Sequence, residues 1–139
     1  MKTSKKTLSQ LRKEADKWFS LAVRYRDCEL VAGEWIGECI TCNKRLGLKQ
    51  GHAGHFMSRR YSITRYDDMN VNLQCPGCNT FNGGEQYKYS RALDDKYGTG
   101  TAEGLFKKAH ESFKPTRDWY EEIISDAKEQ VKFYKNLEP

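Results

Sequence analysis

Four of the five cysteines form two Cys-x-x-Cys pairs, Cys39 with Cys42 and Cys75 with Cys78. Such a turn lets two thiolates reach one zinc ion, and two turns complete the tetrahedral shell that zinc prefers. An ion held by four protein ligands has no open position for water, so its predicted role is structural. Redox pairing is the alternative to metal binding. Cys28 is left over and is expected to be a buried or idle thiol.

A second group of side chains lies between and just after the cysteine pairs: His52, His55, Asn70 and Asn79. Metal-dependent hydrolysis of a phosphodiester needs a base that takes a proton from water and a cation that holds the phosphate. A neutral imidazole near pH 7 suits the base, and the amide oxygen of Asn79 suits a hard cation. These residues therefore predict a catalytic divalent metal, Mg²⁺ or Mn²⁺, beside a histidine.

Basic residues gather around these histidines. Residues 43–66 contain six Lys or Arg and no Asp or Glu, and the whole chain has a net charge of +5. Cations favour a nucleic-acid partner because they displace the counterions condensed on its phosphates, although a solvated basic surface is the alternative. Arg59, four residues beyond His55, is expected to hold the scissile phosphate. The expected contacts to the DNA backbone are Lys44, Arg45, Lys49, Arg60 and Arg65.

Apolar periodicity indicates which elements position these residues. Side chains that recur at steps of three and four predict amphipathic helices over residues 5–26, 85–98, 101–110 and 117–136. Short apolar runs predict strands within 48–57 and at 69–73, and residues 29–38 are expected to form a loop or short strand. After Cys78, residues 79–84 are rich in turn formers, and the helix from Glu85 is predicted to follow the second cysteine pair directly, with Asn79 at its head.

Length and composition fit one small domain. With 139 residues, 37% of them hydrophobic and 31% charged, the chain is expected to form a single α+β domain that is mainly helical. The predicted parts are an N-terminal helix (1–27), a zinc-bound core (28–98) and C-terminal helices (99–139). No apolar run approaches the roughly 18 residues that span a bilayer, and no apolar signal segment follows the N-terminal lysines. We therefore expect a cytoplasmic protein without a membrane partner.

The order of His55, Asn70 and Asn79 resembles that of the HNH, or ββα-metal, endonucleases, in which two antiparallel strands and a helix hold the catalytic residues. A longer string is similar to the phage recombination nuclease family NinG, also called Rap. That string runs from Tyr25-Arg26-Asp27 through Cys39-Ile40-Thr41-Cys42, His52-Ala53-Gly54-His55-Phe56, Asn70 and Gln74-Cys75-Pro76-Gly77-Cys78-Asn79 to Tyr97-Gly98. It covers residues ~18–98, and the combination is specific although each piece alone is weak.

The resemblance implies a role for each matched residue. His55 falls where the family has its general base, at the end of the first strand of a treble-clef-like core. Asn70 matches the asparagine that braces the loop carrying the histidine, and Asn79 matches a ligand of the catalytic metal. Membership implies an endonuclease that acts on branched DNA such as Holliday junctions and D-loops, in the cytoplasm of a bacterial host. HNH enzymes leave 5′-phosphate and 3′-hydroxyl ends.

Position 54 departs from the HNH pattern. Many HNH enzymes have an acidic metal ligand directly before the histidine, and Gly54 has no side chain. Because side chains alternate along a strand, His52 is expected on the same side as Gly54 and opposite to His55, which makes His52 the candidate second ligand. A site without a carboxylate would bind Mg²⁺ weakly and favour Mn²⁺. The carboxylate alternatives are Asp67, Asp68 and Glu85.

These observations predict a metal-dependent DNA endonuclease. The rival hypothesis is a zinc-stabilised DNA-binding module without catalysis, for which replacement of His55 changes no binding and no cation supports cleavage. A third hypothesis is an assembly protein that uses the apolar stripe of helix 117–136 as an interface. That helix could equally pack on its own domain or join two nuclease copies, and a homodimer would suit a junction with two-fold symmetry.

Overall fold

The computed structural model describes residues 5–139, in which a long N-terminal helix is followed by most of the strands and then by the remaining helices. The helices are α1 (Leu8–Arg26), α2 (Ser62–Arg65), α3 (Gln86–Tyr97), α4 (Thr101–Ala109) and α5 (Arg117–Lys135), with a π-helical turn η1 (Gly77–Phe81). The strands are β1 (Cys28–Val31), β2 (Glu34–Glu38), β3 (Arg45–Gly47), β4 (His52–His55) and β5 (Val71–Gln74). About half of the residues are helical.

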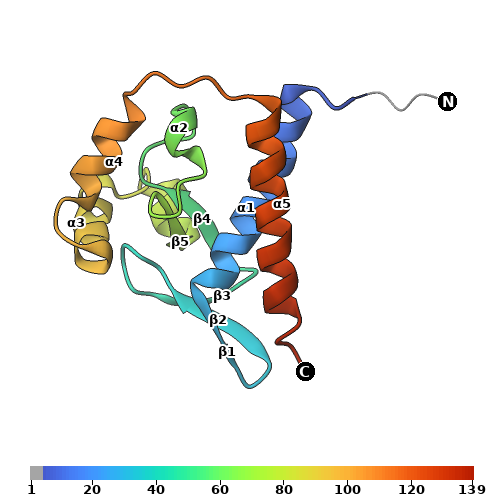
Figure 1. The fold of residues 1–139 in the computed structure, drawn as a ribbon. Helices are drawn as coiled ribbons and strands as arrows, with labels where there is room; N and C mark the ends of the chain where they lie inside the picture. Colours follow the sequence, from blue (N-terminus) through green and yellow to red (C-terminus); the bar gives the residue numbers. More distant parts are fainter. Residues whose placement is uncertain (1–4) are drawn as a thin grey trace.

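The first and last helices, α1 and α5, lie side by side and run in the same direction (Figure 1). Thr7 begins α1 with a reciprocal cap, since its hydroxyl accepts from the Gln10 amide and the Gln10 side chain accepts from the Thr7 amide. The interface buries Leu11 of α1 with Ile124 of α5. The apolar stripe of α5 is therefore covered within the chain rather than offered to a second copy.

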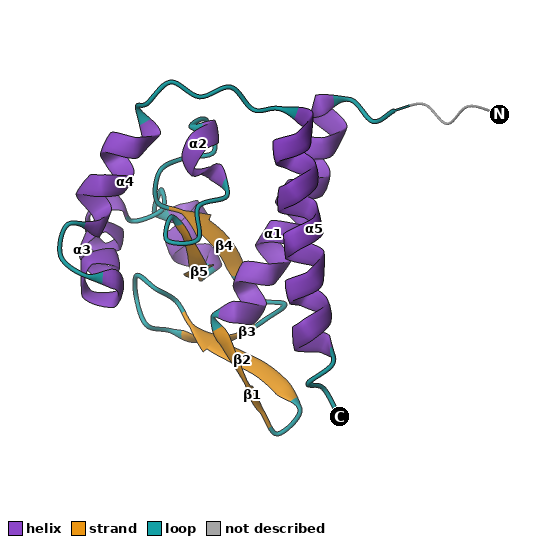
Figure 2. Cartoon of the chain, in the orientation of Figure 1, coloured by secondary structure: helices purple, strands orange, loops and turns teal. Residues whose placement is uncertain are grey.

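The strands form two antiparallel sheets, one ordered β1-β2-β3 and one made of β4 and β5. Figure 2 shows β4 and β5 between the α1–α5 pair and the α3–α4 pair. In β5 every residue is buried. Val71 packs toward α1 and α5 in a core shared with Leu11 and Tyr120, so the N-terminal, central and C-terminal parts contribute to the same core. Because β4 pairs only with β5 among residues 5–139, its other edge has no strand partner in this part of the chain.

The predicted helices are present, and the differences lie in the short helix α2, in the strands and around the second cysteine pair. The segment 29–38, expected as a loop or short strand, belongs to the β1–β2 hairpin. The domain is α+β, as predicted, with about half of its residues in helices. The prediction that Asn79 heads α3 was wrong, because Asn79 lies in the turn-rich segment before it. The turn η1 comes first, and a left-handed Glu85 (φ 54°) precedes α3. Among residues 5–139, no helix combines the length and apolar composition of a membrane span.

Candidate metal centre and active-site cleft

The two cysteine pairs lie in turns that follow strands. Cys39 comes directly after β2, and its carbonyl accepts from the amide of Asn43, which is held in a left-handed conformation (φ 63°). Cys75 comes directly after β5, and its sulfur accepts from the amide of Cys78 at 3.4 Å. Each turn thus places two sulfurs on the same side of the backbone.

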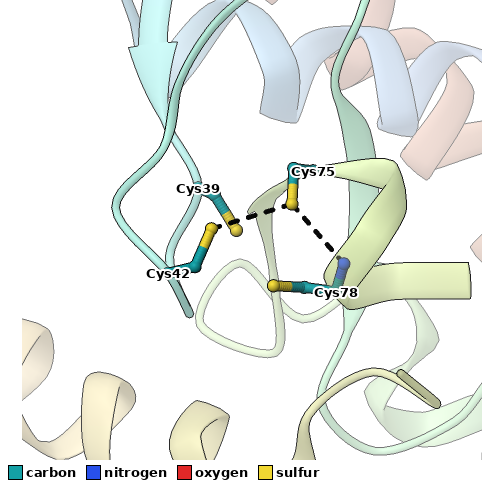
Figure 3. A group of neighbouring side chains, drawn as sticks. All are labelled: Cys39, Cys42, Cys75 and Cys78. Atoms are coloured by element: carbon teal, nitrogen blue, oxygen red, sulfur yellow. Dashed lines mark hydrogen bonds between the residues drawn. The ribbon is translucent and has the colours of Figure 1, made fainter. Parts of the chain in front are cut away.

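The four sulfurs of Cys39, Cys42, Cys75 and Cys78 point toward a common centre (Figure 3) and all lie within 4.8 Å of one another. Cys42 Sγ and Cys75 Sγ are 3.7 Å apart. A tetrahedral zinc ion with bonds of about 2.3 Å has sulfur–sulfur edges of about 3.8 Å. The cluster therefore fits a structural metal such as zinc. Cys28 is buried, as expected, and lies outside the cluster.

Hydrogen bonding favours the thiolate form of one ligand. Burial raises the pKa of Cys39, but hydrogen bonds from the Thr41 hydroxyl and from backbone amides outweigh it and lower that pKa to about 6. The same turn is tied to the central sheet, because the amide of Ile40 donates to the Leu73 carbonyl at 2.9 Å. The cluster thus connects the β1-β2-β3 sheet, the β4–β5 sheet and η1.

A separate cleft of about 560 Å³ runs along the outer edge of β4, between that strand and α1. The residues along it include four of the candidate site residues, His52, His55, Arg59 and Asn79. The two histidines were expected to point to opposite sides of the strand, but both lie along this cleft. Since β4 is an edge strand, both imidazoles border the same cleft.

The ring of His55 is held by its Nε2 atom. Nε2 lies 2.9 Å from the carbonyl oxygen of Arg65, and a carbonyl only accepts, so Nε2 carries the proton and Nδ1 keeps its lone pair. Burial lowers the pKa of His55 to about 4, with smaller contributions from neighbouring charges. At neutral pH the imidazole is therefore uncharged, with one nitrogen able to accept a proton.

His52 and Asn79 meet although 27 positions separate them in the chain. His52 Nδ1 lies 3.0 Å from the side-chain nitrogen of Asn79. Rotating that amide by half a turn places its oxygen beside the imidazole nitrogen, because the two ends of an amide are nearly interchangeable in shape. The His52 Nδ1 atom and the Asn79 amide oxygen would then both point their lone pairs at the same place, which suits a cation. These two uncharged ligands fit a divalent ion, with a preference for the softer metals.

The structure explains why position 54 carries no side chain. A Cβ atom on Gly54 would meet the side chain of Gln74, whose Cβ would be 2.9 Å away. Gln74 is completely buried, and its amide donates to the carbonyl of Gly84 at 2.9 Å. The volume that an acidic ligand would need is therefore filled. None of the proposed carboxylate alternatives borders the cleft: Asp67, Asp68 and Glu85.

Asn70 braces the loop after His55. Its side-chain oxygen accepts from the Met57 amide at 2.8 Å, and its nitrogen donates to the carbonyls of Met57 and Thr64, each at 3.0 Å. Asn70 is completely buried, so these bonds have no water competitor. The contact that the resemblance implied is present, and its link to catalysis stays a prediction.

Comparison with known families identifies the family of this chain. The family model described as bacteriophage lambda NinG protein matches residues 1–138. The chain belongs to the NinG family. Comparison with curated proteins and with solved structures found no match.

One acidic residue of this NinG chain borders the cleft and was not singled out in the sequence. Asp16 of α1 accepts two hydrogen bonds from Arg65, at 2.9 and 2.6 Å, and one from the Tyr66 hydroxyl at 2.7 Å. Arg65 also donates to the carbonyl of Arg59. Asp16 thus holds Arg65 in place, and the Arg65 carbonyl in turn holds His55. Nothing in its local sequence distinguishes Asp16, because the contact joins residues 49 positions apart.

The predicted DNA contacts do not line the cleft that holds His55. Arg65 differs most from expectation, because its guanidinium is engaged by Asp16 and mostly buried. Arg60 is exposed next to the cleft residue Arg59 and lies over the Tyr61 ring. Three other predicted contacts are exposed but lie outside the lining of the His55 cleft: Lys44, Arg45 and Lys49.

Proposed function

We propose that this NinG-family chain is a metal-dependent DNA endonuclease of the HNH type. The observation that carries the proposal is the convergence of a neutral His55, with Nδ1 available, and the His52–Asn79 pair in one cleft. Arg59 borders the same cleft. A pure binding module has no need for an uncharged, oriented imidazole between a cation site and an arginine.

In this mechanism His55 Nδ1 takes a proton from water, and the resulting hydroxide oxygen attacks the phosphorus. The bond from phosphorus to O3′ breaks, and the departing oxygen gains a proton from solvent. The products are a 5′-phosphate and a 3′-hydroxyl. Arg59 neutralises the charge that develops on the phosphate oxygens.

His52 and Asn79 would hold the divalent cation, Mg²⁺ or Mn²⁺. When bound, that cation polarises the phosphate and stabilises the charge on the departing oxygen. Asn70 keeps the loop after β4 in place, so that His55 and Arg59 stay in register. Zinc on the four cysteines would hold the two sheets and η1 together and so keep Asn79 of η1 close to His52 of β4.

The substrate we propose is branched DNA, such as a Holliday junction or D-loop, in keeping with the recombination role implied by the NinG resemblance. The test is cleavage of a labelled four-way junction and of a linear duplex with the same arms, in Mg²⁺, in Mn²⁺ and in EDTA. We expect the junction to be cut preferentially, only with metal.

The decisive variant is His55→Ala, expected to lower the cleavage rate by about 10²- to 10⁴-fold. His110→Ala is the matched control, because His110 is exposed on the C-terminal side of α4 and away from the cleft. Equal cutting of the junction and the duplex would support the nuclease function but contradict the preference for branched DNA. Binding without cleavage in any metal would instead assign the chain to the zinc-stabilised DNA-binding modules.

A further inference from the structure

Three arginine side chains are partly buried near the centre of the molecule, and their partners differ. Arg26 is paired with Asp27 at 2.8 Å, and Arg65 with Asp16 at 2.6 Å. Arg24 donates only to backbone carbonyls, through Nε to Ser20 at 3.3 Å and through Nη1 to Leu48 at 3.1 Å. Within residues 5–139 no carboxylate lies within ion-pair distance of Arg24, and its Nη2 donates to no protein atom.

A partly buried cation without a counter-charge is unfavourable, because it has lost water and gained no ion pair. The direction of the pKa shifts reflects this contrast. Burial lowers the pKa of Arg24, whereas hydrogen bonds to Asp16 raise the pKa of Arg65. A guanidinium has five donors in a plane, and the bonds to Ser20 and Leu48 leave both donors of Nη2 free for the oxygens of an anion such as phosphate. The missing partner is therefore an anion.

Arg24 faces the same cleft as the candidate catalytic residues, at its other end. Asp16 and Arg24 both border the cleft from α1, eight residues apart, which is about 12 Å at a helical rise of 1.5 Å per residue. Asp16 binds Arg65, which holds His55, the last residue of β4. Arg24 binds the carbonyl of Leu48, just before β4 begins. Arg24 and Arg59 thus stand near opposite ends of the β4 edge.

We propose that Arg24 binds a non-scissile phosphate of the DNA strand that lies along the β4 edge. The proposal rests on the nuclease function above. Arg24 lies about 12 Å along α1 from Asp16, whose partner Arg65 holds both His55 and the Arg59 carbonyl. That length corresponds to on the order of three nucleotides at 3.4 Å per step, so the phosphate at Arg24 is not the phosphate at His55 and Arg59. Arg24 then fixes the direction of the strand and centres the scissile phosphate between the His52–Asn79 pair and His55.

Binding measured without cleavage tests this contact. A fluorescently labelled four-way junction is titrated with protein in EDTA over a range of salt concentrations, for the wild type, Arg24→Gln and Arg24→Lys. Removal of one charge–phosphate contact is expected to weaken binding about tenfold and to reduce the slope of log K against log salt by about 0.9. Arg24→Lys keeps the charge and should keep most of the slope.

Two further variants separate a lost contact from a damaged fold. Arg91→Gln removes an exposed arginine on α3 outside this cleft and should change neither affinity nor slope. Ser20→Asp leaves Arg24 and its carbonyl bonds in place but supplies a carboxylate one turn away. That internal partner should weaken DNA binding while thermal stability holds, and Ser112→Asp, exposed outside the cleft, is the charge control.

Unchanged affinity and slope in a folded Arg24→Gln, together with unchanged binding by Ser20→Asp, would overturn the proposal. Failure of the nuclease function has a different signature. In that case binding in EDTA would still depend on Arg24, but no metal would support cleavage by the wild type.

Discussion

The cysteine cluster and the β4 cleft differ in how their residues come together. The cluster takes its four ligands from two tight turns, and the two cysteines of each turn are three positions apart along the chain. The cleft takes its residues from α1, β4, the loop that carries Arg59 and η1. A tight turn fixes the separation of its own side chains, whereas the cleft depends on packing between elements that are distant in sequence.

The two sites also differ in whether their metal coordination is complete. Four thiolates complete the coordination of zinc, so that site has no position left for a substrate. The cleft offers two uncharged metal ligands, His52 and Asn79, together with the base His55 and arginine side chains. This set is too small to fill the coordination of a metal and so leaves positions for water and a phosphate. A closed site suits stability and an open site suits turnover. Changes in the cluster should therefore act on the fold, and changes in the cleft on binding and rate.

The largest expected effect is on the cluster. Cys39→Ser removes a ligand from a site of a kind whose metal contributes about 10 kcal/mol or more to folding, so the variant is expected to lose bound zinc and most of its cooperative unfolding. Cys28→Ser is the control, since Cys28 is buried outside the cluster. Metal content and thermal melting in the presence and absence of EDTA measure the effect. A Cys39→Ser variant that melts like the wild type would remove the structural role of the metal.

The pH dependence of stability distinguishes the cleft from the cluster. The pKa of His55 is about 4 in the folded protein, against 6.5 for a solvated histidine of the unfolded chain. Between these values the unfolded chain binds the extra proton, so this stabilisation is complete above pH 6.5 and is lost as the pH falls toward 4. The loss attributable to His55 is about 3 kcal/mol.

Urea unfolding at pH 7 and pH 4.5 checks this value, with the wild type compared with His55→Gln. The comparison cancels the protonation of the thiolates, which both proteins share. The wild type should lose more stability than the variant over this range. An equal loss in both would mean that the His55 imidazole is freely solvated.

The packing at Gly54 gives an effect of intermediate size. Gly54→Ala places a methyl group against the buried Gln74 side chain and is expected to lower the free energy of unfolding by about 1–3 kcal/mol. Gly47→Ala in β3 is the matched control, because its Cβ would meet its nearest neighbour at 3.5 Å. Combining Gly54→Ala with Gln74→Ala should recover part of the loss in urea unfolding. If Gly54→Ala is as stable as the wild type, Gln74 does not exclude a ligand at this position.

The smallest expected effect is at the pair that supports His55. Asp16→Asn weakens two charge-assisted hydrogen bonds to a partly exposed pair and should lower stability by about 1 kcal/mol. Glu14→Gln, whose partners Lys6 and Lys128 are more exposed, is expected to change stability less. The cleavage rate should fall in Asp16→Asn and stay constant in Glu14→Gln. If both variants cleave DNA at the same rate, Asp16 does not help to position His55.

The cysteine cluster could be predicted from the sequence because spacing alone defines a metal-binding turn. The long helices α1 and α5 were equally predictable, since their buried faces repeat with the helical period. The strands were harder, because β4 has only four residues and contains a buried glycine that leaves no alternating pattern. The turn η1 was missed because its geometry comes from the cysteine turn rather than from local propensity.

The order of amino acids was enough to specify which residues this chain has for chemistry: four paired cysteines, His52, His55 and the asparagines that follow. How these residues are used depends on the packing of the folded chain. That packing brought Asn79 to His52, filled the space beside Gly54 with Gln74, and engaged Arg65 with Asp16. Among residues 5–139 it left Arg24 without a carboxylate partner. Local spacing is fixed by covalent geometry, but the partner of a charged side chain is fixed by which helix packs against which strand.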